Sequence, residues 1–76
     1  MNWDVDVDAI GLLCPLPVLR ARKRLTAMLP GAVLRLRATD PASLVDVPHF
    51  CAQAGHELVW SRDIDGIKTY LIRRGD

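Results

Sequence analysis

Cys14 is the strongest candidate for chemistry, because it stands directly before Pro15 where a helical pattern begins. A cysteine thiolate is a nucleophile, and a helix N-terminus stabilises it through free N–H groups and the positive end of the helix dipole. Pro15 and Pro17 lack an N–H group, so Leu16 and Val18 supply the only donors among the first four helical residues. The position alone supports a reactive thiol and a small buried hydrophobic side chain about equally.

A basic run follows on the same predicted helix. Arg20, Lys23 and Arg24 share a face with Leu16, while Arg22 lies nearer the predicted core boundary. A basic face near a nucleophile can steer an acidic partner by electrostatic attraction, and Leu16 would add an apolar contact. The alternative is the ordinary solvated face of an amphipathic helix.

The second cysteine, Cys51, follows Phe50 on a second helical segment. It could form a disulfide with Cys14 as a resolving cysteine, but a buried structural thiol is the favoured hypothesis because free cysteines are often buried. A redox protein that uses both thiols would normally carry a Cys-x-x-Cys arrangement, which is absent here.

His49, Cys51 and His56 also raise the question of a zinc site. Structural zinc normally takes four ligands, and the local pairs of cysteine or histidine that supply them are missing. We therefore expect no metal site. His56 is expected to cap or hydrogen-bond the turn at the start of a strand.

Two stretches alternate apolar and charged residues, as half-buried strands do. Residues 3–8 place Trp3, Val5 and Val7 on the apolar side and aspartates on the other. Residues 32–38 place Leu34, Leu36 and Ala38 on one face and Val33, Arg35 and Arg37 on the other. If the two strands pair, Arg35 and Arg37 would lie across from the aspartates on a solvated face of the sheet.

The segments between the strands have helical spacing. Residues 15–29 form one predicted helix, which Pro30-Gly31 ends, and its apolar stripe contains Val18, Ala21, Leu25, Met28 and Leu29. Asp40 and Pro41 are typical of a helix cap and a first helical position. Because a residue before proline avoids helical geometry, we expect a short turn over residues 41–46 and a separate helical segment over 48–54, ending at Gly55.

Residues 56–63 and 68–73 are the last two predicted strands, and Asp65-Gly66 between them indicates a hairpin. The buried face of the first of these strands is not evident from its alternation. The order strand, helix, strand, helix, strand, strand predicts an α/β (α+β) fold, a two-layer sandwich of one mixed four-stranded sheet with both helices on one face. We expect a single domain over residues 1–76.

Composition limits the classes of function. The 76 residues include 10 basic and 9 acidic side chains, a net charge of +1, so stable nucleic-acid binding is not expected. The sequence contains no apolar run of membrane-spanning length and no signal-peptide core after Met1. Two cysteines are too few for a disulfide scaffold, so we expect reduced thiols and a cytoplasmic location.

Several motifs point to a known family. Residues 8–17 read DAIGLLCPLP, with Cys-Pro-x-Pro at a helix start. Further motifs follow in order along the chain: PG at 30–31, DPA at 40–42, DVP at 46–48, FC at 50–51, GHEL at 55–58, DG at 65–66 and YLIRRG at 70–75. With these motifs the sequence resembles the TusA/SirA-like sulfur-carrier family over nearly its whole length.

The resemblance implies a two-layer α/β sandwich in which Cys14 is the active residue at the start of the first helix. It implies that Cys14 accepts a sulfane sulfur as a persulfide from a donor, such as a cysteine desulfurase or a rhodanese-like protein. The sulfur would then pass to an acceptor protein, for synthesis of 2-thiouridine in tRNA or related trafficking such as molybdenum-cofactor synthesis. Sulfur-compound oxidation with rhodanese-like and DsrE-like partners is the alternative. No metal or organic cofactor is implied.

Such a protein acts as a stoichiometric carrier in sulfurtransferase half-reactions rather than as an independent enzyme. We expect it to be a monomer. Asp8 and Gly11 are expected to shape the turn that presents Cys14, together with Pro15 and Pro17. Family members often carry a polar residue where this chain has Leu16, which bears on the choice of partner.

An alternative of another class is a non-catalytic module that binds RNA or a regulatory protein through Arg35, Arg37 and the helix basics. With one phenylalanine and one tyrosine, the chain has few rings for a base-stacking platform. The near-neutral charge also disfavours this alternative.

Overall fold

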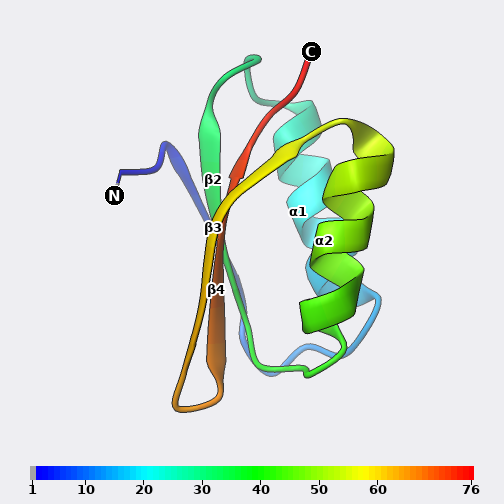
Figure 1. Ribbon diagram of the computed structural model, residues 1–76, viewed down its shortest axis with the longest axis vertical. Coiled ribbons are helices and arrows are strands. Elements are labelled where there is room, and N and C mark those ends of the chain that lie inside the picture. The colour runs from blue at the N-terminus through cyan, green and yellow to red at the C-terminus, as the bar shows by residue number, and fades with distance from the viewer. Residues whose placement is uncertain (1) are drawn as a thin grey trace.

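The computed structural model describes residues 2–76. Its elements follow the order β1 (Val5–Ala9), α1 (Leu16–Thr26), β2 (Val33–Ala38), α2 (Ser43–Ala54), β3 (Glu57–Ile64) and β4 (Ile67–Arg73). Both helices cover the same face of the sheet, which Figure 1 shows edge-on. The predicted two-layer α/β sandwich with one mixed sheet is therefore confirmed.

The four strands lie in the order β1-β2-β4-β3. β1 and β2 pair in parallel, with Ala9 opposite Ala38 at their carboxyl ends. β4 pairs antiparallel with both β2 and β3. The loops that follow β1 and β2 consequently leave the sheet at the same edge.

The hydrophobic core lies between the sheet and the two helices. The strands contribute Val7, Ala9, Leu34, Leu36, Tyr70 and Ile72, and the helices contribute Ala21, Leu25, Val47 and Cys51. The one polar group of Tyr70 is satisfied inside this layer, since its hydroxyl lies 2.8 Å from that of Ser43. This hydrogen bond joins the start of α2 to the centre of the sheet.

The outer face of the sheet carries the predicted ion pairs. Arg35 opposes Asp6 in the register and holds its two carboxylate oxygens at 2.8 and 3.0 Å. Arg37 lies 3.6 Å from Asp6 and 3.8 Å from Asp8. The Arg35 guanidinium accordingly lowers the pKa of Asp6. The two arginines required by the RNA-binding alternative are thus already occupied by carboxylates.

Trp3 departs from the prediction that it shares the buried side of the first strand with Val5 and Val7. β1 begins only at Val5, so the alternation does not extend back to Trp3. The indole lies on the outer face, where the guanidinium carbon of Arg35 stacks 4.0 Å from the ring centroid. The Trp3 side chain remains 40% exposed.

α1 is shorter than the predicted span of residues 15–29, because it ends at Thr26. Ala21 and Leu25 are buried as expected, and Val18 and Met28 pack against the core. Leu29 lies beyond the last turn and is 79% exposed, so its predicted place on the buried stripe is wrong. Arg22 is exposed.

α2 runs unbroken through Pro48, contrary to the predicted interruption at Val47-Pro48. The helix buries one face on both sides of the proline. Its buried residues recur every four positions, at Ser43, Val47 and Cys51. Pro48 itself is exposed. The packing of that face therefore outweighs the local preference of the proline, as tertiary contacts commonly do. Gly55 ends the helix in the left-handed conformation, with φ 76°.

The β3–β4 hairpin turns at the predicted residues. Asp65 and Gly66 both have positive φ, 52° and 81°, as a two-residue type I′ turn requires. A register shift lies between Leu58 and Trp60, which pair with Ile72 and Leu71 respectively. The shift places Leu58 on the helix side and Trp60 on the outer side, which explains why simple alternation did not reveal the buried face.

The segment after β4 is hydrogen-bonded to residues at the C-terminal ends of both helices. Arg74 Nε donates to the carbonyl of Leu25 at 2.7 Å, near the end of α1. The Gly75 N–H donates to His56 Nδ1 at 2.9 Å, so His56 holds the C-terminal backbone as well as beginning the turn into β3. Burial, followed by the charge of Arg74, lowers the pKa of His56.

The Ser43–Tyr70 hydrogen bond gives a test of the packing under α2. Tyr70→Phe leaves the Ser43 hydroxyl buried without its partner, so we expect the free energy of unfolding to fall by about 1–2 kcal/mol. Ser43→Ala should cost a similar amount, and the double variant should cost less than the sum of the two. Urea unfolding followed by circular dichroism measures all three, and strict additivity would contradict the coupling.

Candidate functional site

Cys14 lies at the end of the loop between β1 and α1, and its side chain is exposed. α1 begins at Leu16, so Pro15 occupies the N-cap and not the first helical position that the sequence predicts. Pro17 is the second helical residue and is buried. The thiol therefore stands just outside the helix, on a loop whose end is fixed by a buried proline.

The loop before Cys14 is shaped by short-range hydrogen bonds. Asp8 Oδ1 accepts the N–H of Ile10 at 3.0 Å, which turns the chain as it leaves β1. The Gly11 N–H donates to Thr39 Oγ1 at 3.0 Å, and its φ of 84° is a conformation that favours glycine. The structure thus places Asp8 and Gly11 in the turn that leads to Cys14.

Asp40 makes the connection that fixes the cysteine itself. Its Oδ2 accepts the backbone N–H of Cys14 at 2.6 Å, and its Oδ1 accepts that of Ala42 at 3.1 Å. These two hydrogen bonds hold the pKa of the Asp40 carboxyl below its usual value. The sequence predicted a helix cap at Asp40, but α2 begins at Ser43, and the carboxylate instead ties the loop after β2 to the loop after β1.

Asp46, in the first turn of α2, is the functional neighbour that sequence reasoning missed. Asp46 and Cys14 line the same small hollow, and hydrogen bonding to the Asp46 carboxylate is the main reason that the pKa of Cys14 is raised. The charges of Asp46 and Asp40 act in the same direction. These carboxylate charges oppose the stabilisation of a thiolate that the helix N-terminus is expected to provide.

A groove of about 290 Å³ runs from Cys14 between the two helices. Its lining includes Val18, Leu19 and Phe50, with Arg22, His49 and Asp46 among the polar residues. The apolar side chains beside the thiol are unusually open to solvent, with Leu13 69% exposed and Leu16 46% exposed. An exposed apolar rim with one cation is a surface suited to docking another protein.

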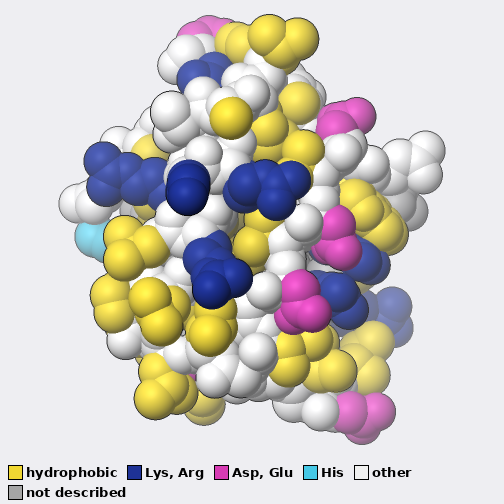
Figure 2. All heavy atoms as spheres, turned by 180° about the vertical axis from the view of Figure 1, so that it is seen from behind, with side chains coloured by type: hydrophobic (Ala, Val, Ile, Leu, Met, Phe, Trp, Pro, Cys, Tyr) yellow, Lys and Arg dark blue, Asp and Glu magenta, His cyan; other side chains and the backbone are white. Residues whose placement is uncertain are grey.

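The predicted docking residues divide between two surfaces. Figure 2 shows basic side chains gathered on the face seen from behind. Arg20, Lys23 and Arg24 line a depression against β1, together with Asp6 and Asp8, and do not line the groove that contains Cys14. Arg22, which the sequence ranked last, is the basic residue of α1 that lines this groove.

Of the remaining candidates, Cys51 and His56 lie apart from the groove that contains Cys14, and His49 lines it. Cys51 is buried, and burial raises the pKa of its thiol to about 11, which fits the structural thiol and not a resolving cysteine. His49 lies on the groove, whereas His56 contacts the C-terminal backbone. Across residues 2–76, no group of three or more His, Cys, Asp or Glu side chains is arranged to hold a metal ion.

The fold is similar to that of a SirA-like protein of known structure. The crystal structure of a SirA-like protein from Desulfitobacterium hafniense superposes with a TM-score of 0.84 at 25% identity, covering 96% of this chain and 100% of that one. Residues 5–74 match the family described as Sulfurtransferase TusA. The sulfur carrier protein TusA of Allochromatium vinosum is 47% identical over 73 residues, which are 96% of each chain. The chain therefore belongs to the TusA family of sulfur carriers.

Members of this family act together with partner proteins, and the groove beside Cys14 offers a surface for such contacts. Within residues 2–76, none of the helices has the length and apolar character needed to cross a bilayer.

The role of Asp46 can be tested through the titration of Cys14. In Asp46→Asn the main acceptor of the thiol hydrogen bond loses its charge, so the pKa of Cys14 should fall and the pH profile of alkylation should move to lower pH. The rate of Cys14 modification by iodoacetamide, followed by peptide mass spectrometry over a pH series, gives this pKa.

Asp65→Asn is the matched control, because Asp65 is not among the carboxylates that shift the pKa of Cys14 and asparagine tolerates the positive φ at this position. Its alkylation profile should coincide with that of the wild type. A Cys14 pKa that stays the same or rises in Asp46→Asn would contradict the assignment.

Proposed function

We propose that Cys14 carries sulfur as a persulfide, which it receives from a donor protein and passes to an acceptor protein. The observation that carries the proposal is the exposed free thiol of Cys14 at the open end of the α1–α2 groove. Membership of the TusA family supports the same assignment. The only other cysteine is buried, so it is poorly placed to exchange sulfur with another protein.

Both half-reactions are thiol–disulfide exchange in form. In the first, the Cys14 thiolate attacks the terminal sulfur of a donor persulfide, a new S–S bond forms on Cys14, and the donor leaves as a thiolate. In the second, an acceptor thiolate attacks the terminal sulfur of that persulfide, and Cys14 leaves as the thiolate. The sulfane sulfur keeps its oxidation level throughout, so the exchange needs no external oxidant or reductant.

The raised pKa of Cys14 slows both steps in the free protein. A thiol of higher pKa is less ionised but more nucleophilic once ionised, and it is a poorer leaving group. A cationic residue of a docked partner near Asp46 would offset the carboxylate charge and favour the thiolate. We infer that Cys14 is held mostly protonated in the free carrier and becomes ionised within the complex.

The donor is proposed to be a cysteine desulfurase or a rhodanese-like protein, and the acceptor a downstream relay protein. Synthesis of 2-thiouridine in tRNA, or related sulfur trafficking, is the proposed destination. The chemistry needs Cys14 as a free thiol, which the reducing cytoplasm maintains, so a cytoplasmic location is part of the proposal.

Persulfide formation is tested by incubating the protein with a cysteine desulfurase and cysteine, followed by intact-mass spectrometry. The wild type should gain about 32 Da, the mass of one sulfur atom, at Cys14. Cys51→Ser should gain the same mass, and Cys14→Ser should gain none. A wild-type protein without the adduct, or a persulfidated Cys14→Ser variant, would defeat the proposal.

The docking role of the groove is tested with a pair of charge reversals on α1. Arg22→Glu should slow sulfur loading by about three- to tenfold at low salt, because an acidic partner rim would then be repelled beside the thiol. Arg24→Glu makes the same change of charge on the surface that faces β1, and it should have a smaller effect.

The loading rate is measured as the growth of the persulfide adduct at several salt concentrations. The difference between the two variants should shrink as salt rises, since exposed charges are screened. Equal slowing by both variants would instead assign docking to the whole basic face, as the sequence first predicted.

A further inference from the structure

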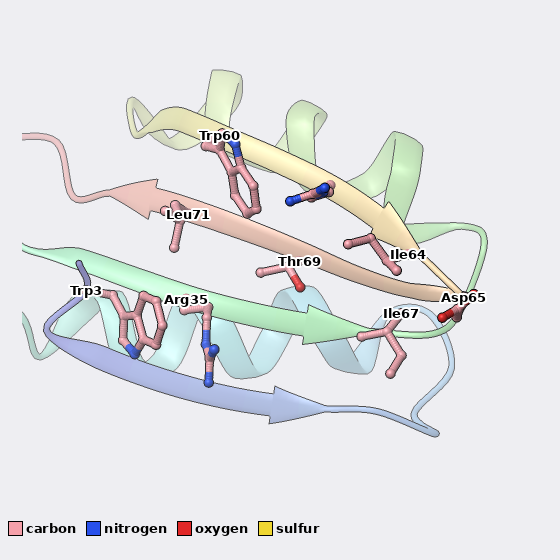
Figure 3. A pocket seen from close by; sticks show the side chains of 9 residues that line it. Trp3, Arg35, Trp60, Ile64, Asp65, Ile67, Thr69 and Leu71 are labelled. Carbon is pink, nitrogen blue, oxygen red and sulfur yellow. The ribbon is translucent and has the colours of Figure 1, made fainter. Parts of the chain in front are cut away.

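The outer face of the sheet, opposite the helices, contains a second hollow. Its volume is about 480 Å³, within the range of small-molecule sites. One ring comes from Trp3, just before β1, and another from Trp60 on β3, both on this outer face. Leu71 and Thr69 lie between them on β4 (Figure 3). Cys14 is not among the residues that line it. This hollow is therefore separate from the proposed sulfur site.

The hollow has aromatic walls, and one of them is held by a neighbouring side chain. Trp3 is stacked on Arg35, and Arg35 is in turn held by both carboxylate oxygens of Asp6. Leu71 is only 2% exposed although it points to the outer face, whereas Trp3 and Trp60 remain 40% and 37% exposed. The two indoles thus offer open ring surface beside an apolar floor, which is a surface that stacks planar aromatic groups.

One cation at the hollow is available for a ligand. Among residues 2–76, Arg35, Arg37 and Arg73 on the outer face each pair with a carboxylate, whereas Arg62 has neither an ion-pair nor a hydrogen-bond partner. Figure 3 shows Asp65 at the hairpin end of the hollow, beyond Ile64 and Ile67. A stacking surface with one unpaired guanidinium is complementary to an aromatic ring that bears an anionic group.

We propose that this hollow binds a small planar aromatic molecule with one anionic group, whose ring packs against Trp3 and Trp60 and whose anion pairs with Arg62. Aromatic carboxylates and nucleoside monophosphates share this chemistry.

A second copy of the chain fits the face less well, because it would bury the Asp6–Arg35 and Glu57–Arg73 ion pairs at a cost in desolvation. A nucleic-acid chain would pass the carboxylates of Asp4, Asp6 and Asp8 at the β1 edge, which repel phosphates.

The two tryptophans are the only ones in the chain, so their indole N–H signals in ¹H–¹⁵N correlation spectra report on the hollow directly. The probes are 1-naphthoate and AMP, with 1-naphthalenemethanol and adenosine as their uncharged counterparts. Both indole signals and the Thr69 and Leu71 amides should shift and saturate with the anionic probes. Each anionic probe should bind at least about threefold more tightly than its counterpart, and the stronger of the two identifies the ligand class.

Three variants separate the contributions. Trp60→Ala should weaken binding about tenfold through lost stacking, and Arg62→Gln should remove the preference for the anionic probe while retaining the ring. Leu44→Ala removes an exposed apolar side chain from α2, in the other layer, and should change neither. Signals elsewhere in the spectrum establish that each variant is folded.

Several outcomes would overturn the proposal. Indole signals that do not shift, or equal binding of charged and uncharged probes, would remove the aromatic-anion site. Signals that shift with protein concentration alone, with a dimer in sedimentation, would assign the face to a second copy. Tighter binding of a short single-stranded RNA than of AMP would assign it to nucleic acid. None of these outcomes bears on persulfide formation at Cys14, which is measured separately.

Discussion

The parallel pairing of β1 with β2 is the constraint on which the sulfur site depends. Parallel neighbours end at the same edge of a sheet, so the loop after Ala9 and the loop after Ala38 must meet there. Two hydrogen bonds join these loops, one from the Gly11 N–H to Thr39 Oγ1 and one of 2.6 Å from the Cys14 N–H to Asp40. The pairing of two core strands therefore determines where the surface loop holds the Cys14 thiol.

The site combines an accessible sulfur with an acidic setting. Asp40 accepts a hydrogen bond from the backbone of Cys14, and Asp46 raises the pKa of its thiol. A carrier must accept sulfur from one protein and lose it to another, and we propose that ionisation of Cys14 only within a complex would protect it against other oxidants and electrophiles. The exposed leucines beside Cys14 and Arg22 on the groove are the surface proposed for such complexes.

Four features could be predicted from the sequence: the element order, the Asp–Arg pairing across the sheet, the Asp65-Gly66 turn and the family. Each of them depends on local periodicity or on contiguous motifs. The sequence did not reveal that Pro48 lies within a continuous helix, since the burial of Val47 and Cys51 that sustains it is a tertiary effect. The contact of Asp46 with Cys14 joins residues 32 positions apart and has no local signature. The exposed position of Trp3 and the approach of Arg22 to the groove likewise depend on where β1 starts and how the helices pack.

The C-terminal segment is anchored at the end of the molecule remote from the thiol. Arg74 holds the carbonyl of Leu25 at the far end of α1, which is about 16 Å long, and Cys14 precedes its first turn (Figure 1). A surface-attachment tag or a fluorescent fusion placed after Asp76 would therefore leave the sulfur free to meet partners in solution. The protein is suited to immobilised pull-down and single-molecule work in that orientation.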